Sequence, residues 1–302
     1  MGRKLPVFSI IIPTYVRPEQ LGACLQSLAC LDYPRDYFEV IVADDGSEAP
    51  PEAVVAAFRD RFDVTLTTQP HAGPAAARNT GAAGAKGEIL AFTDDDCAPA
   101  PDWLQTLAAR FAAAPDHAIG GRTLNVLSDN MYSTASQLLI EYLYAYYNAD
   151  HKPASFFTSN NLALPTASFY AIGGFDSSFP RAGAEDRDLC DRWLQHGYRM
   201  TYAPEARIYH SHALTLRTFC RQHFNYGRGA LCFHHLRARR GSGRFKVEPV
   251  SFYLNLLRYP YSQMRDRRLC LLALLLAVSQ TANAAGFFWE GLIQMAKKAI
   301  LR

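Results

Sequence analysis

The sequence predicts an α/β protein with a Rossmann-like, mostly parallel central sheet, followed by a helical C-terminal region. Three observations lead to this prediction. In residues 1–100, short apolar runs alternate with amphipathic or alanine-rich segments, as strands and helices do in a parallel sheet. Polar or acidic residues follow three of these runs, and ligands of such sheets bind at the carboxyl ends of the strands. Residues 213–302 instead combine positive charge with long apolar segments.

The first predicted strand covers residues 7–12, and we expect Pro13 to end it because proline cannot donate to a central ladder. Three further apolar runs have strand length, and the segments between them have helical spacing or composition. These strands are expected at residues 38–43, 64–67 and 89–93, and the helices at residues 19–28, 51–62 and 73–83.

The second half of the chain alternates less regularly. Residues 133–147 form a predicted helix rich in tyrosine, and such a stripe is more often core than a platform for sugars. Another helix is expected to open within residues 183–189, because the apolar positions Leu189, Cys190, Trp193 and Leu194 have helical spacing. Short strands are expected at residues 119–124, 156–162, 200–202 and 207–209.

Charge divides the chain at about residue 212. The formal net charge is +3, but residues 213–302 hold 15 Lys/Arg against 3 Asp/Glu and carry +12, whereas residues 1–212 carry −9. The acidic part suits a cation-dependent site and the basic part suits an anionic surface. The seven scattered cysteines predict free thiols in a reducing cytoplasm. The first apolar run is too short for a signal peptide, so we expect no export.

Three consecutive carboxylates, Asp94, Asp95 and Asp96, follow the predicted strand at 89–93. Side chains alternate along a strand, so Asp94 and Asp96 would point one way and Asp95 the other. Adjacent carboxylates repel one another unless a cation or several donors neutralise them. Such oxygen ligands favour Mg²⁺ or Mn²⁺, which usually accompany a phosphate. The alternative is a solvated acidic turn that caps the following helix.

Two other strand ends carry polar groups that would converge on the same crevice, Pro13-Thr14-Tyr15 and Asp44-Asp45. Neither a GxGxxG fingerprint nor a GxxxxGK[ST] loop follows the first strand, so a nicotinamide enzyme and a P-loop ATPase are not favoured. Phosphate would then be held by metal and arginine. Arg78 is the candidate arginine, and a plain surface arginine is the alternative.

A second polar group lies between residues 185 and 212. Glu185, Asp186 and Asp188 open a predicted helix, and because one acid is enough for a cap, the surplus favours a functional carboxylate beside the capping interpretation. His210 and His212 end a short strand, where they fit metal ligation as well as a structural role.

Together these motifs resemble family 2 glycosyltransferases of the glycosyltransferase-A fold, over roughly residues 7–235. The matching motifs, in order, are Pro13-Thr14-Tyr15, Asp44-Asp45-Gly46-Ser47, Arg78-Asn79-Thr80-Gly81, Asp94-Asp95-Asp96, Gly173-Gly174-Phe175-Asp176, Glu185-Asp186-Arg187-Asp188-Leu189 and Ala206 with His210. The resemblance implies a nucleotide-diphosphate-sugar donor, bound with Mn²⁺ or Mg²⁺ and transferred with inversion at the anomeric carbon. It implies a catalytic domain over residues 1–212, with a nucleotide-binding half at about 7–115 and an acceptor half at about 116–212.

The resemblance also assigns donor-binding roles to individual residues. The donor-binding set is Pro13, Thr14, Tyr15, Asp44, Asp45, Arg78, Asp94 and Asp95. Pro13 and Tyr15 would line the nucleobase pocket. Asp45, with Asp44 beside it, would accept a hydrogen bond from the imide N–H of the base, and Arg78 would approach the diphosphate.

The metal site implied by the resemblance combines the DxD pair with a histidine. Asp94 would face ribose and metal, and Asp96 would bind the metal. His210 would complete the metal site, with His212 as the fallback. The metal and Arg78 would stabilise the negative charge on the departing nucleoside diphosphate.

Asp186 would be the general base and Glu185 its neighbour near the acceptor, because the attacking hydroxyl needs a base opposite the leaving group. We identify no nucleophile for a retaining double displacement. Processive synthases of the family carry a QxxRW motif, whose Arg and Trp are replaced in Gln222-His223-Phe224-Asn225-Tyr226. We therefore expect transfer of one sugar, with uridine as the family-weighted base, to a hydroxyl of a glycan or a lipid-linked acceptor.

Two alternatives remain. A sugar nucleotidyltransferase also uses metal and nucleotide, although residues 13–17 lack the glycines of its first loop. The second alternative is a membrane-docked protein that binds nucleotide sugars without catalysing transfer, although the presence of Asp96 and Asp186 argues against it. No nucleic-acid-binding module accompanies the basic region, so we expect no nucleic acid partner.

The basic region at 213–302 is predicted to dock on the inner face of the cell membrane, leaving the protein cytoplasmic. Residues 269–278 are apolar, but polar residues interrupt the run before 284–289, which is short of the about 20 apolar residues a span needs. Basic residues on both sides suit two cytoplasmic ends, and the aromatic segment at 252–261 suits an interfacial anchor. A helical pair packed on the catalytic domain or on a second subunit, and a single span, are the alternatives.

Overall fold

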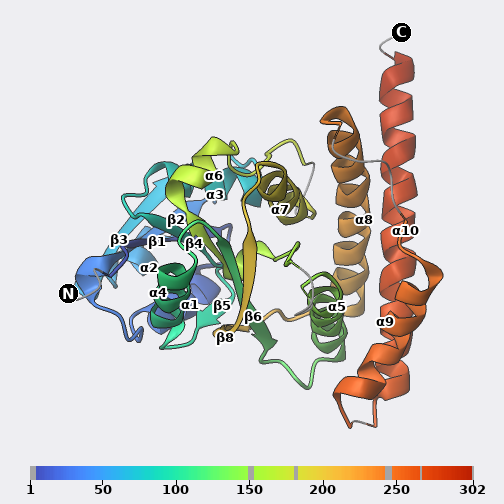
Figure 1. Ribbon diagram of the computed structural model, residues 1–302, viewed down its shortest axis with the longest axis horizontal. Coiled ribbons are helices and arrows are strands. Elements are labelled where there is room, and N and C mark those ends of the chain that lie inside the picture. Colours follow the sequence, from blue (N-terminus) through green and yellow to red (C-terminus); the bar gives the residue numbers. More distant parts are fainter. Residues whose placement is uncertain (1–4, 149–152, 180–182, 242–246, 266, 301–302) are drawn as a thin grey trace. The chain divides into compact units, whose positions relative to one another are not determined.

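The computed structural model describes residues 5–148, 153–179, 183–241, 247–265 and 267–300 (Figure 1). The chain forms two compact units. The first unit consists of Met1–Val126, Asn148–Ser177 and Asp186–Ser211, and the second of Leu127–Tyr147, Ser178–Glu185 and His212–Arg302. The division expected after residue 212 lies one residue from the last of these boundaries. The second unit also takes in two earlier segments of the chain.

Within the described residues, the first unit contains one eight-stranded sheet in the order β3-β2-β1-β4-β7-β6-β8-β5. The strands are β1 (Phe8–Thr14), β2 (Phe38–Asp44), β3 (Asp63–Thr68), β4 (Ile89–Phe92), β5 (Cys97–Pro99), β6 (Ala118–Asn125), β7 (Leu162–Pro165) and β8 (Met200–His210). The helical elements around it are α1 (Pro18–Leu28), η1 (Arg35–Tyr37), α2 (Glu52–Ala56), α3 (Pro74–Ala83), α4 (Trp103–Ala113), η2 (Ser159–Asn161), α6 (Thr166–Ala171) and α7 (Glu185–Gln195).

The sheet is mostly parallel, as predicted. Strand β1 pairs in parallel with β2 and β4, β2 with β3, and β6 with β8, whereas β7 runs antiparallel to β4 and β6, and β5 antiparallel to β8. Strands β1, β2 and β4 are buried along their whole length. This explains why they are nearly continuous apolar runs, because helices cover both faces of a parallel sheet.

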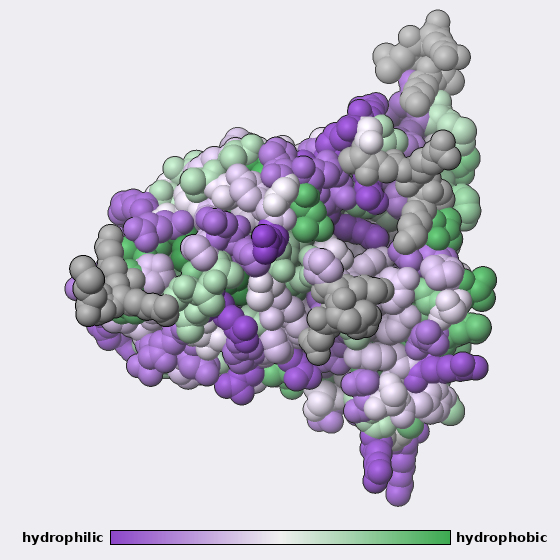
Figure 2. All heavy atoms as spheres, viewed as in Figure 1, coloured by the Kyte–Doolittle hydropathy of each residue, from purple (hydrophilic) through white to green (hydrophobic). Residues whose placement is uncertain are grey.

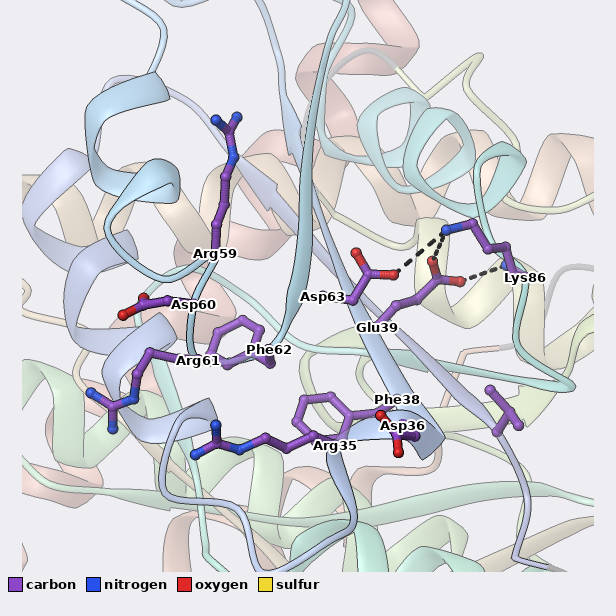
Figure 3. A pocket seen from close by; sticks show the side chains of 11 residues that line it. Arg35, Asp36, Phe38, Glu39, Arg59, Asp60, Arg61, Phe62, Asp63 and Lys86 are labelled. Carbon is purple, nitrogen blue, oxygen red and sulfur yellow. Dashed lines mark hydrogen bonds and ion pairs between the residues drawn. The ribbon is translucent and has the colours of Figure 1, made fainter.

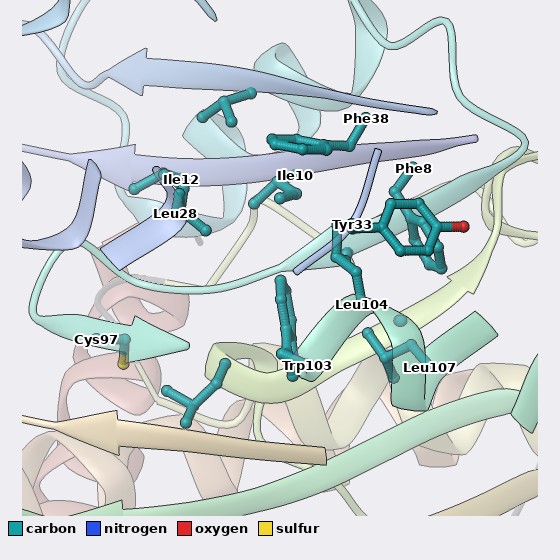
Figure 4. Close-up of a cluster of buried hydrophobic side chains, with 14 of the residues drawn as sticks. Phe8, Ile10, Ile12, Leu28, Tyr33, Phe38, Cys97, Trp103, Leu104 and Leu107 are labelled. Carbon is teal, nitrogen blue, oxygen red and sulfur yellow. The ribbon is translucent and has the colours of Figure 1, made fainter. Parts of the chain in front are cut away.

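Different helices cover the two faces of this sheet. On one face, Ile10 and Ile12 of β1 belong to the same buried cluster as Leu28 of α1 and Trp103 of α4 (Figure 4). On the other face, α3 lies close to β1, because a Cβ added to Gly81 would be only 2.7 Å from the side chain of Ile11. Helix packing on both faces therefore fixes these strands, and the carboxyl ends of β1, β2 and β4 lie together on one side of the sheet, where the parallel strands end.

Some strand boundaries differ from the predictions. Strand β1 continues through Pro13 to Thr14, because pairing with β4 has already ended at Ile11 and the missing N–H on that side costs no ladder bond. Residues 200–210 form one strand, and the ladder with β6 absorbs the irregularity as a register shift between Gly121 and Arg122.

Two other predicted elements are shorter than expected. The strand expected at 156–162 starts only at Leu162, after the η2 turn. Helix α2 ends at Ala56, and the chain then turns so that Phe62 packs on Phe38 with ring centroids 5.9 Å apart. The short strand β5 was not predicted, because three residues carry no detectable alternation.

The second unit is helical. Its helices are α5 (Met131–Tyr147), α8 (Leu216–Arg239), α9 (Val250–Gln263) and α10 (Leu269–Ile300). Tyr142 of α5 is 6% exposed, packs on Phe252 and donates its hydroxyl to the carbonyl of Phe252. The interpretation of the tyrosine stripe as core is thus confirmed at this position.

Helices α8 and α10 touch backbone to backbone. A Cβ added to Gly227 of α8 would lie 1.8 Å from the carbonyl oxygen of Asn283, and one added to Gly286 of α10 would lie 1.9 Å from that of Phe224. Arg228, the residue after Gly227, and Glu290, one turn beyond Gly286, form an ion pair at 2.8 Å with side chains 16% and 7% exposed.

The polar residues predicted to interrupt the apolar run of α10 do not interrupt the helix. Ser279 and Thr281 donate their hydroxyls back to the carbonyls of Leu276 and Ala277, which satisfies them within the helix. Among the described residues, Leu269–Lys297 is the one helix long and apolar enough to cross a membrane by length and composition. Only 28% of its most apolar window is buried within the structure.

Candidate active site

The carboxyl ends of β1, β2 and β4 bring the predicted polar groups of the first unit together. The backbone N–H of Asp45 donates to the carbonyl of Thr14, which joins the first two strand ends. The hydroxyl of Thr14 donates to Asp95 at 2.8 Å, which joins the first to the acidic turn. The convergence predicted from three strand ends is therefore observed.

Asp45 is buried and binds the loop that follows β3. Its Oδ1 accepts from Gln69 and from the backbone N–H of Ala72, and its Oδ2 accepts from the N–H of Gly73 and lies 2.9 Å from Nδ1 of His71. A carboxylate has about four acceptor directions, so these contacts use its whole capacity. A nucleobase that binds Asp45 would displace one of them, and the side chain of His71 is 60% exposed.

Asp44 and Tyr15 lie at the neighbouring strand ends, beside Asp45 and His71. Asp44 accepts from the backbone N–H and the hydroxyl of Ser47, so it fixes the turn after β2. Tyr15 is 45% exposed, and its ring stacks on His71 with centroids 4.4 Å apart. Both rings of this stacked pair are therefore partly open to solvent.

Arg78 is buried, which excludes the surface-arginine alternative. Its Nη2 donates to Asp94 at 2.7 Å, and its guanidinium lies over the ring of Phe175 at 5.5 Å. The next residue, Asn79, bonds both the N–H and the carbonyl of Phe175. Motifs that are separated by about a hundred residues thus form one packed unit at the acidic turn.

The three acids do not alternate as strand residues would. Strand β4 ends at Phe92, and Asp94 to Asp96 lie in a turn closed by a bond from the N–H of Cys97 to the carbonyl of Asp94. Asp95 and Asp96 share one partner, Arg17, whereas Asp94 contacts Arg78.

Burial raises the pKa of Asp95 to about 6. The charge of Arg17 and the hydroxyl of Thr14 act in the opposite direction, because both stabilise the ionised carboxylate. The neighbouring carboxylates Asp96 and Asp94 add to the raising effect of burial. The acidic turn is therefore a poorly solvated concentration of negative charge.

Asp96 faces His210 of β8, with Oδ1 3.1 Å from Nε2 and side chains 7% and 22% exposed. The pairing of β5 with β8 sets this distance, because Cys97 lies opposite His210 and the N–H of Ser211 donates to the carbonyl of Asp96. The fallback residue, His212, belongs to the second unit, where its Nε2 lies 2.9 Å from Gln222.

The acids at the start of α7 have different environments. Asp188 is fully buried and accepts from Arg192 at 2.7 Å, so it is a structural partner of that arginine. Asp186 is half-buried, and one of its oxygens accepts from the N–H of Arg187. Glu185 is 6% exposed and accepts from the N–H of Gly183, two residues before it, so it fixes the chain that leads into α7.

Two functional candidates, Arg17 and His71, were missed from the sequence. Arg17 follows the Pro13-Thr14-Tyr15 strand end by two residues, and His71 lies in the loop before α3. A basic residue within three positions of a predicted ligand-binding strand end was the available signal for Arg17. Nothing in the sequence near His71 indicated its contact with Asp45.

A pocket of about 470 Å³ lies at the opposite ends of the strands from the acidic turn, beside the amino ends of β2 and β3 (Figure 3). It is lined by Arg35, Arg59, Arg61 and Lys86 and by Asp36, Glu39, Asp60 and Asp63, so its formal charges balance. Lys86 lies 3.5 Å from both Glu39 and Asp63. We assign no part of the chemistry to this pocket, because the predicted site residues lie at the other ends of the strands.

Known proteins resemble this chain in sequence and in fold. The family described as glycosyl transferase family 2 matches residues 9–175, and the N-terminal domain of galactosyltransferase matches residues 144–214. Validoxylamine A glucosyltransferase from Streptomyces hygroscopicus is 31% identical over 67% of this chain and 54% of its own length. The pre-mycofactocin glycosyltransferase of Mycobacterium tuberculosis is 31% identical over 74% of this chain and 46% of its own. The chain thus spans about half the length of these relatives.

Among solved structures, the mannosyltransferase PcManGT from Pyrobaculum calidifontis, in complex with GDP-Man and Mn²⁺, matches with a TM-score of 0.62 and 22% identity over 98% of this chain and 81% of its own. TarS 1–349 of S. aureus, in complex with UDP-GlcNAc, matches with a TM-score of 0.55 and 18% identity over 96% of this chain and 92% of its own. At these identities the likeness concerns the glycosyltransferase-A fold. The family match covers more than half of the chain, and the protein is therefore a glycosyltransferase of family 2.

Proposed function

We propose that the protein transfers one sugar, with inversion, from a nucleotide-diphosphate sugar to a hydroxyl of a glycan or lipid-linked acceptor. The observation that supports this most is the convergence of Asp45, Arg78, Asp95 and Asp96 at the carboxyl ends of neighbouring strands. A base-side carboxylate, a buried guanidinium and a cation-binding acid are the groups that a nucleoside diphosphate needs.

The donor atoms at Asp96 and His210 suit a divalent cation. Two ligands that share an octahedral ion at 2.0–2.1 Å lie about 3 Å apart, and Oδ1 of Asp96 is 3.1 Å from Nε2 of His210. Asp94 is the third proposed ligand, with a side chain 29% exposed. The oxygen-rich set fits Mn²⁺ or Mg²⁺. When bound, the ion would stabilise negative charge on the departing diphosphate as a Lewis acid.

Other residues near the proposed cation site would bind the diphosphate and the base of the donor. Arg78 would donate to the diphosphate, and Phe175 and Asp94 hold its guanidinium in place beforehand. The ring pair of Tyr15 and His71 would receive the base. UDP is our first choice of nucleotide, and GDP must be tested beside it, because similar solved structures contain either UDP-GlcNAc or GDP-Man.

Asp186 is the proposed general base. It is less buried than Asp188 and lies in the first turn of α7, where a half-exposed carboxylate is open to an acceptor hydroxyl and could take its proton. Glu185, at the start of the same helix, is the proposed neighbour on the acceptor side.

The test is a panel of UDP- and GDP-sugars with Mn²⁺, read by sugar hydrolysis and by thermal unfolding. A donor that binds must raise the melting temperature by mass action, and chelation of the metal should remove the effect. Asp96→Asn should abolish metal-dependent donor binding while its melting temperature without ligand stays within a few degrees of wild type. Manganese-dependent turnover by that variant would refute the metal assignment.

We also propose that α10 docks on an anionic membrane surface. Apolar side chains gather over this helix in Figure 2. The exposed large apolar side chains of α10 form one group near its start and one near its end, with three- and four-residue spacing within each group: Leu271 and Leu274, then Phe288, Trp289, Leu292 and Met295. Arg258, Arg265 and Arg267 are exposed in the preceding segment. An apolar stripe beside arginines matches the acyl boundary and the phosphates of anionic lipids.

Packing against α8 argues for docking rather than crossing. The buried side of α10 contacts α8 through Gly286 and through the ion pair of Glu290 with Arg228. Helix α8 contains five arginines. Carrying such a partner into hydrocarbon would cost about 2.5–3.5 kcal/mol for each charge near the centre. A peripheral site also keeps the chain beside lipid-linked acceptors.

Flotation of the full chain with vesicles tests the docking. We expect binding to vesicles rich in phosphatidylglycerol, weak binding to pure phosphatidylcholine, and loss of binding in the Trp289→Glu, Leu292→Glu double variant. Tyr170→Glu, at a half-exposed position of the first unit, is the matched control. In cells, carbonate should release the protein. Retention after carbonate would mean that α10 crosses, and a vesicle-independent dimer broken by the double variant would assign the stripe to a second copy.

A further inference from the structure

The acidic turn of the first unit is held by an arginine that the proposed reaction does not use. Nη1 of Arg17 lies 3.2 Å from Oδ1 of Asp95 and 3.1 Å from Oδ2 of Asp96. The two carboxylates have side chains 6% and 7% exposed, whereas that of Arg17 is 46% exposed. One half-exposed guanidinium therefore reaches from solvent onto two nearly buried carboxylates.

The backbone before Arg17 is strained. Val16 has φ of 54°, a left-handed conformation that β-branched residues rarely adopt. Its N–H donates to the hydroxyl of Ser47 at 2.9 Å, and Ser47 in turn bonds Asp44. Strain of this kind persists where the surrounding structure over-determines it, and it concentrates at functional sites. The contact of Arg17 with the acids thus follows from a specific, costly turn.

Arg17 and a divalent cation would compete for Asp96. Its Oδ1 faces His210 and its Oδ2 faces Arg17, so an ion held by Asp96 and His210 lies on the carboxylate that the guanidinium already contacts. Two positive charges on one poorly solvated carboxylate repel each other. Each must therefore lower the affinity of Asp96 for the other, because the coupling between two binding events is reciprocal.

We infer that Arg17 couples cation binding to donor binding. It neutralises Asp95 and Asp96 and so opposes a cation that arrives alone. A nucleoside diphosphate supplies the negative charge that both cations can share, and Arg17 then moves from the carboxylates toward the phosphates. This inference rests on the proposed cation site, and it adds that Arg17 sets how strongly the binding of the metal depends on the donor.

Direct Mn²⁺ titrations, read by the electron paramagnetic resonance signal of the free ion, test this coupling. They use the full chain, with and without saturating UDP or GDP. For wild type we expect weak Mn²⁺ binding alone and much tighter binding with nucleotide. For Arg17→Gln we expect Mn²⁺ alone to bind about tenfold tighter, as removal of one opposing charge contact implies. The gain from nucleotide should shrink by a similar factor.

Two control variants test whether the change in Mn²⁺ affinity comes from the positive charge at position 17 or from the loss of any positive charge on the protein. Arg17→Lys keeps the positive charge and should stay close to wild type. Arg61→Gln, exposed at the opposite ends of the strands (Figure 3), removes the same charge and should leave Mn²⁺ affinity unchanged. Equal or weaker Mn²⁺ binding by Arg17→Gln, with a normal melting temperature, would overturn the inference. If wild type binds no Mn²⁺ even with nucleotide, the cation site itself is wrong.

Discussion

Nδ1 of His71 lies 2.9 Å from Oδ2 of the buried Asp45, and the same imidazole stacks on Tyr15. The buried carboxylate of Asp45 thus holds the loop after β3 in place, and His71, one of its partners in that loop, is exposed to solvent. Displacement of His71 is the simplest way for a base to reach Asp45, because the other partners include the backbone N–H groups of Ala72 and Gly73.

Asp45→Asn should weaken both nucleotide binding and the loop. An amide accepts at only one of its two polar atoms, so buried N–H groups of the loop lose their acceptor, at a cost of about 1–3 kcal/mol. Calorimetric titration with UDP and urea unfolding measure the two effects. Asp36→Asn, exposed at the opposite ends of the strands, should change neither. Wild-type stability in Asp45→Asn would show that the loop does not depend on this carboxylate.

Asp186→Asn and Asp188→Asn should fail in different ways. Asp186→Asn is expected to lose sugar transfer while keeping donor affinity and stability, because a general base acts on the acceptor. Asp188→Asn leaves the buried guanidinium of Arg192 without its countercharge and should destabilise the protein by about 3–5 kcal/mol. Single-turnover transfer, donor titration and urea unfolding separate the two. Equal loss of donor affinity and activity in Asp186→Asn would place it in the donor site.

Gly286→Ala should destabilise the second unit strongly, because the new Cβ would lie 1.9 Å from the carbonyl oxygen of Phe224. Helices α8 and α10 would have to separate, which also disturbs the ion pair of Arg228 with Glu290. Gly291→Ala is the matched control in the same helix, since its Cβ would meet only the side chain of Leu231 at 3.6 Å. Thermal unfolding of both variants decides, and equal melting temperatures would contradict the close packing.

Acid should destabilise the second unit through His223. Its ring is 1% exposed, with neither nitrogen hydrogen-bonded among the described residues, and burial lowers its pKa to about 4. The unfolded chain takes up this proton near the ordinary pKa of 6.5, so stability falls as the pH drops from about 6.5 to about 4, by up to about 3 kcal/mol.

His223→Leu should reduce that pH dependence, because leucine does not titrate and its side chain fits an apolar site. Urea unfolding at pH 7 and pH 5 measures the change. The exposed His235→Gln should keep the wild-type profile. An unchanged slope in His223→Leu would mean that other groups cause the acid effect.

Val16→Asn should stabilise the protein by about 1 kcal/mol. Asparagine tolerates the left-handed conformation at φ of 54°, and the valine side chain is 63% exposed, so little packing is lost. Val126→Asn, at a 48% exposed position without positive φ, is the control and should give no gain. A loss of stability in Val16→Asn would show that the valine side chain has a role of its own.

The order of apolar runs and polar strand ends determined the fold class and most of the candidate site. A buried parallel strand must be a nearly continuous apolar run, and its carboxyl end must present whatever follows it, so Asp45 and Asp94 could be placed from local pattern alone. Local pattern also named Arg78 and His210 as candidates, the family resemblance favoured the functional alternative for each, and the structure brings both to acids of the same turn.

Only the tertiary structure decided which partner each charge takes. Asp188 turned out to be bound to Arg192, and Arg17 to Asp95 and Asp96. The structure also decided that α10 is one helix. The hydroxyls of Ser279 and Thr281 donate to backbone carbonyls of the same helix, so these polar residues interrupt the apolar pattern without ending the helix. Such outcomes depend on contacts between segments far apart in the chain, and local sequence patterns do not reveal those contacts.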